Sequence, residues 1–336
     1  MKIKAIGFDL AKNVFQAHGV DESGRAALQR RLRRSQVLEF FAQLEPCLVG
    51  MEACAAAHYW ARKLMELGHT VRLMATQLVK PYVKTNKNDA RDAEAICEAL
   101  LRPSMRFVPV KDVEQQAVLS LHRLREGLVE SRTALVNRLR GLLAEFGVVV
   151  PVGRKRFEQA LPGIIQEAEE VPELLRGALV GMQDELAACN QRIAEMEARL
   201  RTWHRGNEAS RRLEELPGVG VLTATAMVAT VGGHAKLFDR GRQFAAWLGL
   251  TPRQHSSGEK TRLLGISKRG DNYLRKLLVH GARSVVNAHR PERNPWLTAI
   301  LARRPKNVAV VALAQRNARI VWAMLANGTH YQPKAA

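Results

Sequence analysis

Cysteine, acidic side chains and long apolar runs are all scarce in this sequence, and each scarcity excludes a class of protein. The four cysteines are scattered and form no CxxC pair or Cys/His cluster with zinc-site spacing, so we expect reduced, buried thiols in a cytoplasmic protein. No apolar run approaches the length of a membrane span, and the one near the N-terminus is too short for a signal peptide. We therefore expect no membrane association.

The shortage of acidic residues leaves a large positive charge. There are 52 lysines and arginines against 32 aspartates and glutamates, a net charge of +20. A folded protein with this excess usually binds a polyanion, and nucleic acid is favoured over a membrane surface because the charge is not collected on one amphipathic helix. With 336 residues, 46% of them hydrophobic, the chain can form two or three domains with a sizeable core.

The first hundred residues alternate between strand-like and helix-like stretches. Residues 3–11, 14–21 and 24–33 read as a meander of three strands, and 35–45 as a helix with Ser35 as N-cap. Strands at 47–52 and 69–75 then alternate with a helix at 57–68 and a helix containing Asp89 and Asp92. This order predicts an α/β domain with a mixed sheet flanked by helices.

The remainder reads as mainly helical. A leucine stripe predicts a helix over 113–146, and residues 171–204 carry an a/d heptad seam, which fits either an antiparallel hairpin or a dimer. Two helices joined by a Pro-Gly-Val-Gly turn occupy 213–232, a polar loop runs from Thr251 to Gly265, and helices continue to about Asn327. We predict domains at 1–110, with closing helices reaching about 150, at 111–207 and at 208–330.

Four acids stand at structurally meaningful places. Asp9 lies in or at the end of the first strand, Glu52 ends a later strand, and Asp89 and Asp92 share one face of a helix start. Carboxylates that converge require a cation, and hard divalent ions such as Mg²⁺, or alternatively Mn²⁺, take oxygen ligands and can act on a phosphodiester. Taken singly, Asp89 and Asp92 could merely complement a helix dipole and Asp9 could be a turn residue.

Basic side chains surround these acids and recur near the C-terminus. Lys84, Lys87 and Arg91 would hold a phosphate backbone beside the carboxylates. The turn with Gly218 and Gly220 is typical of a helix-hairpin-helix, in which exposed N–H groups hold phosphate, although it could be a plain interhelical turn. The polar loop and its flank carry a further set of candidate phosphate contacts, namely Arg253, Lys260, Arg262, Lys268 and Arg269.

Two serines precede a glycine in that polar loop. Ser257 comes directly before Gly258, where it could present a hydroxyl to a phosphate, and His255 is a candidate base or a phosphate contact. The alternative is that Ser256 and Ser257 only cap the backbone or bind phosphate.

The pieces "GFDLAKN", "VGMEACAAAHYW", "KNDARDAEAI", "LPGVGVLTA" and "AAWLGLTPRQHSSGEKTRLLGISKRGDNYLRKLL" occur in an order that resembles the DEDD-type insertion-sequence transposases, the bridge-RNA-guided serine recombinases. The resemblance covers nearly the full chain. It implies a RuvC-like, RNase H-fold N-terminal domain, a helical coiled-coil middle and a helical C-terminal transposase domain.

The same resemblance implies roles for individual residues. Asp9, Glu52, Asp89 and Asp92 would bind Mg²⁺, and Ser257 would join DNA covalently through a phosphoserine, with Ser256 as a rival. A structured noncoding guide RNA would pair with donor and target double-stranded DNA while the protein reads backbone and shape. Family members assemble as dimers of dimers on two DNAs. The resemblance also implies a protein of the bacterial cytoplasm that associates with the nucleoid.

Two other functions remain open at this stage. A metal-dependent, RuvC-like junction nuclease would use the same acids with water as nucleophile. A non-catalytic nucleic-acid-binding protein would need only the basic charge.

Overall fold

The computed structural model describes residues 2–83, 89–258, 260–289 and 294–333, and of Asp89 the backbone alone. The chain divides into two compact units, Met1–Val113 and Glu114–Ala336. We describe each unit by itself. The division into three domains expected from the sequence stays a prediction.

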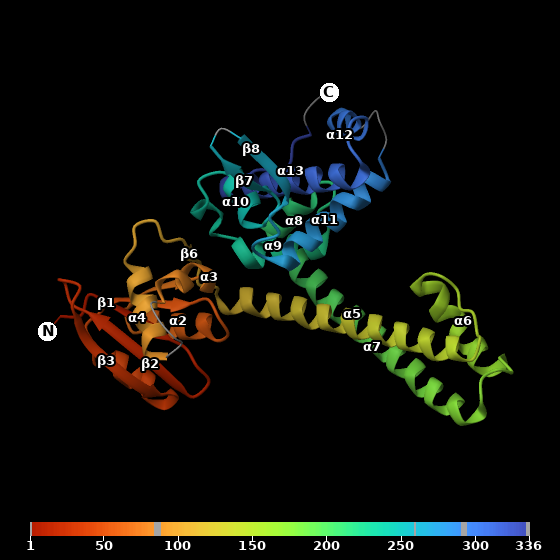
Figure 1. The fold of residues 1–336 in the computed structure, drawn as a ribbon, viewed down its shortest axis with the longest axis horizontal. Helices are drawn as coiled ribbons and strands as arrows, with labels where there is room; N and C mark the ends of the chain where they lie inside the picture. The colour runs from red at the N-terminus through yellow and green to blue at the C-terminus, as the bar shows by residue number, and fades with distance from the viewer. Residues whose placement is uncertain (1, 84–88, 259, 290–293, 334–336) are drawn as a thin grey trace. The chain divides into compact units, whose positions relative to one another are not determined.

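Unit 1 is built on a six-stranded mixed sheet in the order β3-β2-β1-β4-β5-β6, which confirms the α/β class (Figure 1). The antiparallel meander β1 (Ala5–Asp9), β2 (Val14–Val20) and β3 (Ala26–Arg33) forms one half. Two parallel strands, β4 (Leu48–Glu52) and β5 (Thr70–Met74), continue the sheet beside β1. A short antiparallel strand, β6 (Phe107–Val108), closes the far edge and was not expected from the sequence.

Helices cover both faces of this sheet because alternate strand residues are apolar on both sides. The helices α1 (Val37–Ala42) and α2 (Ala57–Glu66) pack on the face that carries Phe8, Phe15 and Met51. The opposite face packs against α4 (Asp89–Leu100) and the short α3 (Thr76–Val79), which the sequence reading missed.

The expected N-cap at Ser35 is wrong. A 3₁₀ turn at Arg34–Gln36 precedes α1, and Gln36, not Ser35, is the N-cap residue of α1. The Gln36 side chain instead accepts a hydrogen bond from the backbone N–H of Arg33 at 2.9 Å. The glutamine thus satisfies a backbone donor ahead of the 3₁₀ turn, and no side-chain hydrogen bond caps α1 itself.

Unit 2 begins with a long helical hairpin. Helix α5 (Val113–Glu145) and helix α7 (Glu173–Gly206) lie side by side, with α6 (Arg154–Glu167) packed at the connection (Figure 1). The heptad seam of α7 is buried against α5 of the same chain, since the Cys189 thiol donates to Leu128 O at 3.1 Å and Arg125 pairs with Glu197 at 2.7 Å. Of the two readings of the heptad seam, an antiparallel hairpin or a dimer, this packing within one chain corresponds to the hairpin.

Two details of this hairpin differ from expectation. Helix α6 was not predicted from the sequence, because Pro162 and the basic start hide an amphipathic pattern whose Phe157, Leu161 and Ile165 are buried. Leu124, assigned to the buried stripe of α5, is 57% exposed, and His122 lies inside instead.

The rest of unit 2 is a helical core around α9 (Val221–Val231), whose residues from Thr223 to Val231 are all buried. Around it lie α8 (Glu208–Glu214), α10 (Gly241–Trp247) and α11 (Asn272–Asn287), followed by α12 (Pro295–Leu301) and α13 (Lys306–Asn327). A hairpin of β7 (Pro252–Ser257) and β8 (Lys260–Ile266) projects between α10 and α11.

Within the described ranges, α13 alone has the length and apolar character of a membrane span. The core helix of a water-soluble protein can have the same length and composition. Its buried residues, including Ala314, Ala318 and Val321, belong to the same core cluster as those of α9 and α11, so we treat α13 as a core helix.

A buried histidine joins three helices of unit 2. His122 of α5 is 1% exposed, and its ring nitrogens contact the Tyr273 hydroxyl at 2.8 Å and the Thr225 hydroxyl at 3.0 Å. Thr225 donates its own proton to Val221 O, so the neutral tautomer with the proton on Nε2 satisfies every partner. Burial lowers the pKa of His122 to about 4 and raises that of Tyr273 to about 12.

Replacing His122 with Gln should flatten the pH dependence of stability. The folded pKa of about 4 lies below the ordinary 6.5, so the unfolded chain binds more protons between these values. The stabilisation is therefore complete above about pH 6.5 and is lost as the pH falls toward 4, by up to ~3 kcal/mol. Urea denaturation from pH 7.5 to 5 measures it, and the exposed His280→Gln is the control. Identical slopes for wild type and His122→Gln would contradict this assignment.

Candidate active site

The strand register places two of the four candidate acids at one end of one face of the sheet. Strands β1 and β4 are parallel and pair Ala5 with Leu48, Ile6 with Val49 and Gly7 with Gly50, and the same spacing aligns Asp9 with Glu52. Side chains alternate between faces, so Asp9 lies on the face of Ala5 and Gly7, and Glu52 on that of Leu48 and Gly50. This is the face that α4 covers.

Helix α4 approaches this face closely because glycine occupies the contact. A Cβ atom at Gly7 would lie 2.0 Å from Ala93 O and 2.5 Å from Cys97 N, so only glycine lets the backbones of β1 and α4 meet. Ala93, Ile96, Cys97 and Leu100 form the buried face of α4. Asp92 is adjacent to Ala93 at the start of this helix, and the contact at Gly7 therefore positions the beginning of α4 beside the strand ends.

The electrostatics show that the carboxylates lie near one another. Burial raises the pKa of Glu52, a hydrogen bond from the Thr76 hydroxyl opposes that rise, and the charge of Asp92 adds to it. Cys54 is exposed, so the expectation that all four thiols are buried is wrong for this one. Partial desolvation raises the pKa of its thiol, and the charges of Glu52 and Asp9 raise it further. Asp92 is thus close enough to Glu52, and Asp9 and Glu52 are close enough to Cys54, for their charges to act on these groups.

Asp9, Glu52 and Asp92, the three candidate acids whose side chains the structure describes, are not in metal-binding geometry. Among the described residues, no group of three or more His, Cys, Asp or Glu side chains could hold a metal ion as they stand. The Asp89 side chain lies outside the described part of the chain, as do Lys84 and Lys87. Arg91 is exposed on the first turn of α4 and engages in an interaction of its own.

The second candidate element is the β7–β8 hairpin, where the sequence reading of an unstructured loop is wrong. All six residues of β7 are exposed, so the segment lacks the apolar alternation by which strands are recognised. The strands pair Ser257 with Lys260, Ser256 with Thr261 and His255 with Arg262. Gly258, at the turn, has a φ of +59°, which favours glycine.

This register separates the two serines. Residues two apart in a strand share a face, so Ser257 lies on the face of His255, together with their cross-strand partners Lys260 and Arg262. Ser256 lies on the opposite face, where Gln254 Nε2 donates to its hydroxyl oxygen at 3.0 Å. Ser257 is thus the serine on the cationic face.

The base of the hairpin is fixed to the helical core although its tip is exposed. A Cβ atom at Gly249 would lie 2.1 Å from Arg269 O, and one at Gly270 would lie 1.8 Å from Trp247 O. The guanidinium of Arg275, 9% exposed, donates to Leu248 O at 3.0 Å and Arg269 O at 3.2 Å. These contacts hold both ends of the hairpin in place.

The basic residues near the hairpin fall into two groups. The predicted phosphate contacts are all exposed: Arg253, Lys260, Arg262, Lys268 and Arg269. Arg275 and Lys276 add to the positive charge of this segment in the sequence, but Arg275 is buried and Lys276 pairs with Glu126 of α5. Their side chains serve helix packing, and the charge presented to a ligand is smaller than the sequence suggests.

The Pro-Gly-Val-Gly turn joins α8 to α9. Gly218 has a φ of +89°, and a Cβ there would lie 3.0 Å from Gly281 O of α11. Asn317 of α13 donates to Pro217 O at 2.9 Å. Packing thus accounts for Gly218, whereas Gly220 at the start of α9 is exposed with open space around it. Phosphate binding by these glycines stays a prediction.

Sequence reasoning missed Gly7, Thr76 and Cys54. Thr76 lies two residues after the end of β5, where the chain leaves the same sheet end as Glu52, and that placement was the available signal. Gly7 lies inside "IGFDL", where a glycine within a strand marks close approach of another backbone.

Comparison of the sequence with those of known proteins identifies the family. The family model for DEDD transposases of the IS110 type matches residues 6–147, and the model described as "Transposase IS116/IS110/IS902 family" matches residues 210–296. A "Probable family 20 transposase" of Pseudomonas aeruginosa is 54% identical to this chain. The match covers 99% of this chain and 100% of the relative.

Two further relatives agree. The "Transposase for insertion sequence element IS1111A" of Coxiella burnetii is 46% identical over 98% of this chain and 92% of the relative. The "Transposase for insertion sequence element IS1328" of Yersinia enterocolitica is 40% identical over 97% of this chain and 98% of the relative. Such similarity defines a DNA-processing enzyme. The chain belongs to the IS110-type family of insertion-sequence transposases.

Substituting Gly7 with Ala should destabilise the protein and impair its DNA chemistry. The new methyl group would overlap Ala93 O, so α4 must shift away from β1 and carry Asp92 with it. We expect a loss of about 1–3 kcal/mol in the free energy of unfolding, measured by urea denaturation. Gly127→Ala in α5 is the matched control, because its Cβ has open space and alanine favours the helix. Equal behaviour of the two variants would contradict the close-packing account.

Proposed function

We propose that this transposase is an RNA-guided DNA recombinase that cleaves and exchanges strands through a covalent phosphoserine intermediate at Ser257. The observation that carries the proposal is the hairpin register, which pairs Ser257 with Lys260 and groups it with His255 and Arg262 on one exposed face. A nucleophilic hydroxyl needs positive charge beside the phosphate it attacks, and this face supplies two cations. Ser256, engaged with Gln254 on the other face, is the weaker candidate.

The chemical step is a phosphoryl transfer with no net redox change. Ser257 Oγ forms a bond to a DNA phosphorus as the bond from that phosphorus to one deoxyribose oxygen breaks. The hydroxyl proton passes to a base and the departing oxygen takes up a proton. His255 is a candidate for that base, or else it contacts the phosphate. Attack by a hydroxyl of the second DNA on the phosphoserine would restore the serine and complete strand exchange.

The acids of unit 1 form the second half of the proposed site. Asp9, Glu52, Asp89 and Asp92 would hold Mg²⁺, or Mn²⁺ in its place. What supports this is the donor chemistry: half-buried carboxylate oxygens share one end of the sheet, and Asp92 makes the charge of Glu52 more costly. When bound, such ions stabilise the oxygens that enter and leave a phosphodiester. The chain's own part is to hold the carboxylates together through the packing of α4 on β1.

The architecture supports the finer family assignment. A three-stranded meander with β1 central and two parallel strands beyond it is the arrangement expected of an RNase H-like, RuvC-like domain. The turn before α9 supports a helix-hairpin-helix contact to DNA at Gly220, since the helix start is exposed there.

The partners we propose follow from the charge and the family. They are donor and target double-stranded DNA, a structured noncoding guide RNA, and further copies of the chain in a dimer of dimers. A net charge of +20 supports the nucleic-acid partners. Such an enzyme would work at the nucleoid of the bacterial cytoplasm.

A covalent adduct tests this function. Purified protein is incubated with RNA from the element ends, labelled donor DNA, target DNA and Mg²⁺, and resolved on a denaturing protein gel. Wild type and Ser256→Ala should give a labelled protein–DNA band, whereas Ser257→Ala and Asp92→Asn should lose it by at least ~100-fold, as expected for loss of a nucleophile or of transition-state charge stabilisation.

The alternative function, a metal-dependent junction nuclease that uses water as nucleophile, predicts a different result. It would give cleaved DNA without any adduct, and cleavage would survive Ser257→Ala but stop with Asp92→Asn. That result would overturn the serine mechanism. A band lost with Ser256→Ala and kept with Ser257→Ala would overturn the choice of serine.

A further inference from the structure

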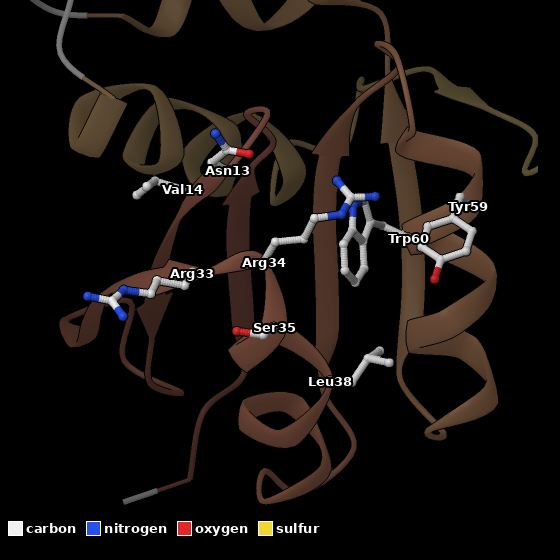
Figure 2. A pocket seen from close by; sticks show the side chains of 8 residues that line it. All are labelled: Asn13, Val14, Arg33, Arg34, Ser35, Leu38, Tyr59 and Trp60. Carbon is white, nitrogen blue, oxygen red and sulfur yellow. The ribbon is translucent and has the colours of Figure 1, made fainter.

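A pocket of about 700 Å³ opens in unit 1 on the face opposite the candidate acids (Figure 2). Its walls include Asn13 at the start of β2, Arg33 at the end of β3, and Tyr59 and Trp60 on the first turns of α2. It therefore lies at the end of the sheet where β1 and β4 finish. Trp60 belongs to the core cluster under α1 and α2, so the pocket is on the face opposite α4.

Two aromatic side chains give the pocket a rigid platform. Trp60 is 3% exposed, and its ring packs edge-to-face on Phe15 with a centroid distance of 5.3 Å. Tyr59, beside it, is 41% exposed and meets Trp60 edge-to-face at 5.2 Å. A large exposed aromatic ring held by a buried one presents a flat apolar surface at little cost in conformational entropy.

Two hydrogen-bond donors of this pocket, on Trp60 and Arg34, lie next to each other. Trp60 Nε1 is buried and has no hydrogen-bond partner within the described part of the chain. The guanidinium of Arg34 lies over the same indole, 5.1 Å from its centroid, and reaches across to it in Figure 2. A guanidinium only donates, so it cannot satisfy the indole N–H. A ligand with acceptor oxygens or nitrogens would satisfy both groups.

The charge of the pocket is uncompensated. Arg33 and Arg34 are exposed, and neither has an acidic partner among the described residues. Arg30, two residues before the buried Leu32, adds positive charge to the same face of the edge strand β3. The ligand should therefore be anionic as well as flat.

We propose that this pocket binds an unpaired nucleotide of a single-stranded nucleic acid. The base would stack against Tyr59, an acceptor atom would face Trp60 Nε1, and the phosphate would contact the guanidinium of Arg34, which lies over the indole. Stacking on an aromatic ring requires a free base face, which a continuous duplex does not offer. The strand could be RNA or DNA, because both supply the same flat base and the same phosphate.

Binding of labelled single strands to the full-length protein tests the proposal. Fluorescence anisotropy is measured with a 20-nucleotide RNA, a DNA of the same sequence and the corresponding DNA duplex, in buffer with EDTA, so that the result does not depend on strand transfer. Tyr59→Ala should weaken single-strand binding about tenfold, and Tyr59→Phe, which keeps the ring, should bind like wild type. Arg33→Gln/Arg34→Gln should weaken it further and lower its salt dependence.

A double variant in unit 2 serves as the control for the loss of two positive charges. Arg303→Gln/Arg304→Gln removes two exposed arginines of unit 2 and should leave the single-strand preference intact. Loss of RNA binding alone assigns the pocket to RNA, and equal losses assign it to either strand type. Losses equal to those of the control, or losses for the duplex as large as for single strands, would overturn the proposal. A change in oligomeric state with nucleic-acid binding intact would also overturn it, in favour of a second copy as occupant.

Discussion

The backbones of β1 and α4 meet at Gly7 with no room for a side chain, and the candidate metal site depends on this contact. Because Ala93 O and Cys97 N lie where a Cβ would be, α4 is held directly on the strand that ends at Asp9. Parallel pairing with β4 brings Glu52 to the same end and face, and the start of α4 adds Asp92. The packing of α4 on β1 holds Asp92 close enough to Glu52 for its charge to raise the pKa of that carboxyl.

Unit 2 uses the same device for a different purpose. Gly218 of the Pro-Gly-Val-Gly turn meets Gly281 of α11, and Gly249 and Gly270 bring the two ends of the serine hairpin against the core. Ile266 at the end of β8 packs against that core, but all six residues of β7 are exposed. A rigid base with an exposed tip is suited to presenting one hydroxyl and several cations to a large ligand, because little order has to be gained on binding.

The sequence predicted those parts of the molecule in which local pattern and tertiary packing agree. The strands around Phe8, Phe15 and Met51 alternate clearly, and the helices from Val113 and Glu173 have long periodic faces. The hairpin of Ser257 escaped prediction because exposed strands carry no apolar alternation, and α6 did so because Pro162 lies within it. The separation of Ser256 from Ser257 depends on cross-strand register, which only the fold supplies.

The sequence indicated which acids are candidates and where they lie along the chain, but it could not show that their side chains share one face of the sheet. Asp9 and Glu52 could be placed at strand ends, yet their common face requires the pairing of β1 with β4. The contribution of Thr76 and the exclusion of any side chain at Gly7 likewise follow from contacts between segments far apart in the sequence.

The most direct test of this account is whether the α4 face of unit 1 binds a divalent cation. Mn²⁺ binding to the full-length protein can be counted by electron paramagnetic resonance, without DNA or RNA. We expect Mn²⁺ to bind to wild type and to Glu39→Gln, an exposed carboxylate of α1 on the opposite face, and to be lost in Asp9→Asn and Asp92→Asn. Undiminished Mn²⁺ binding in the Asp9 and Asp92 variants would contradict the account.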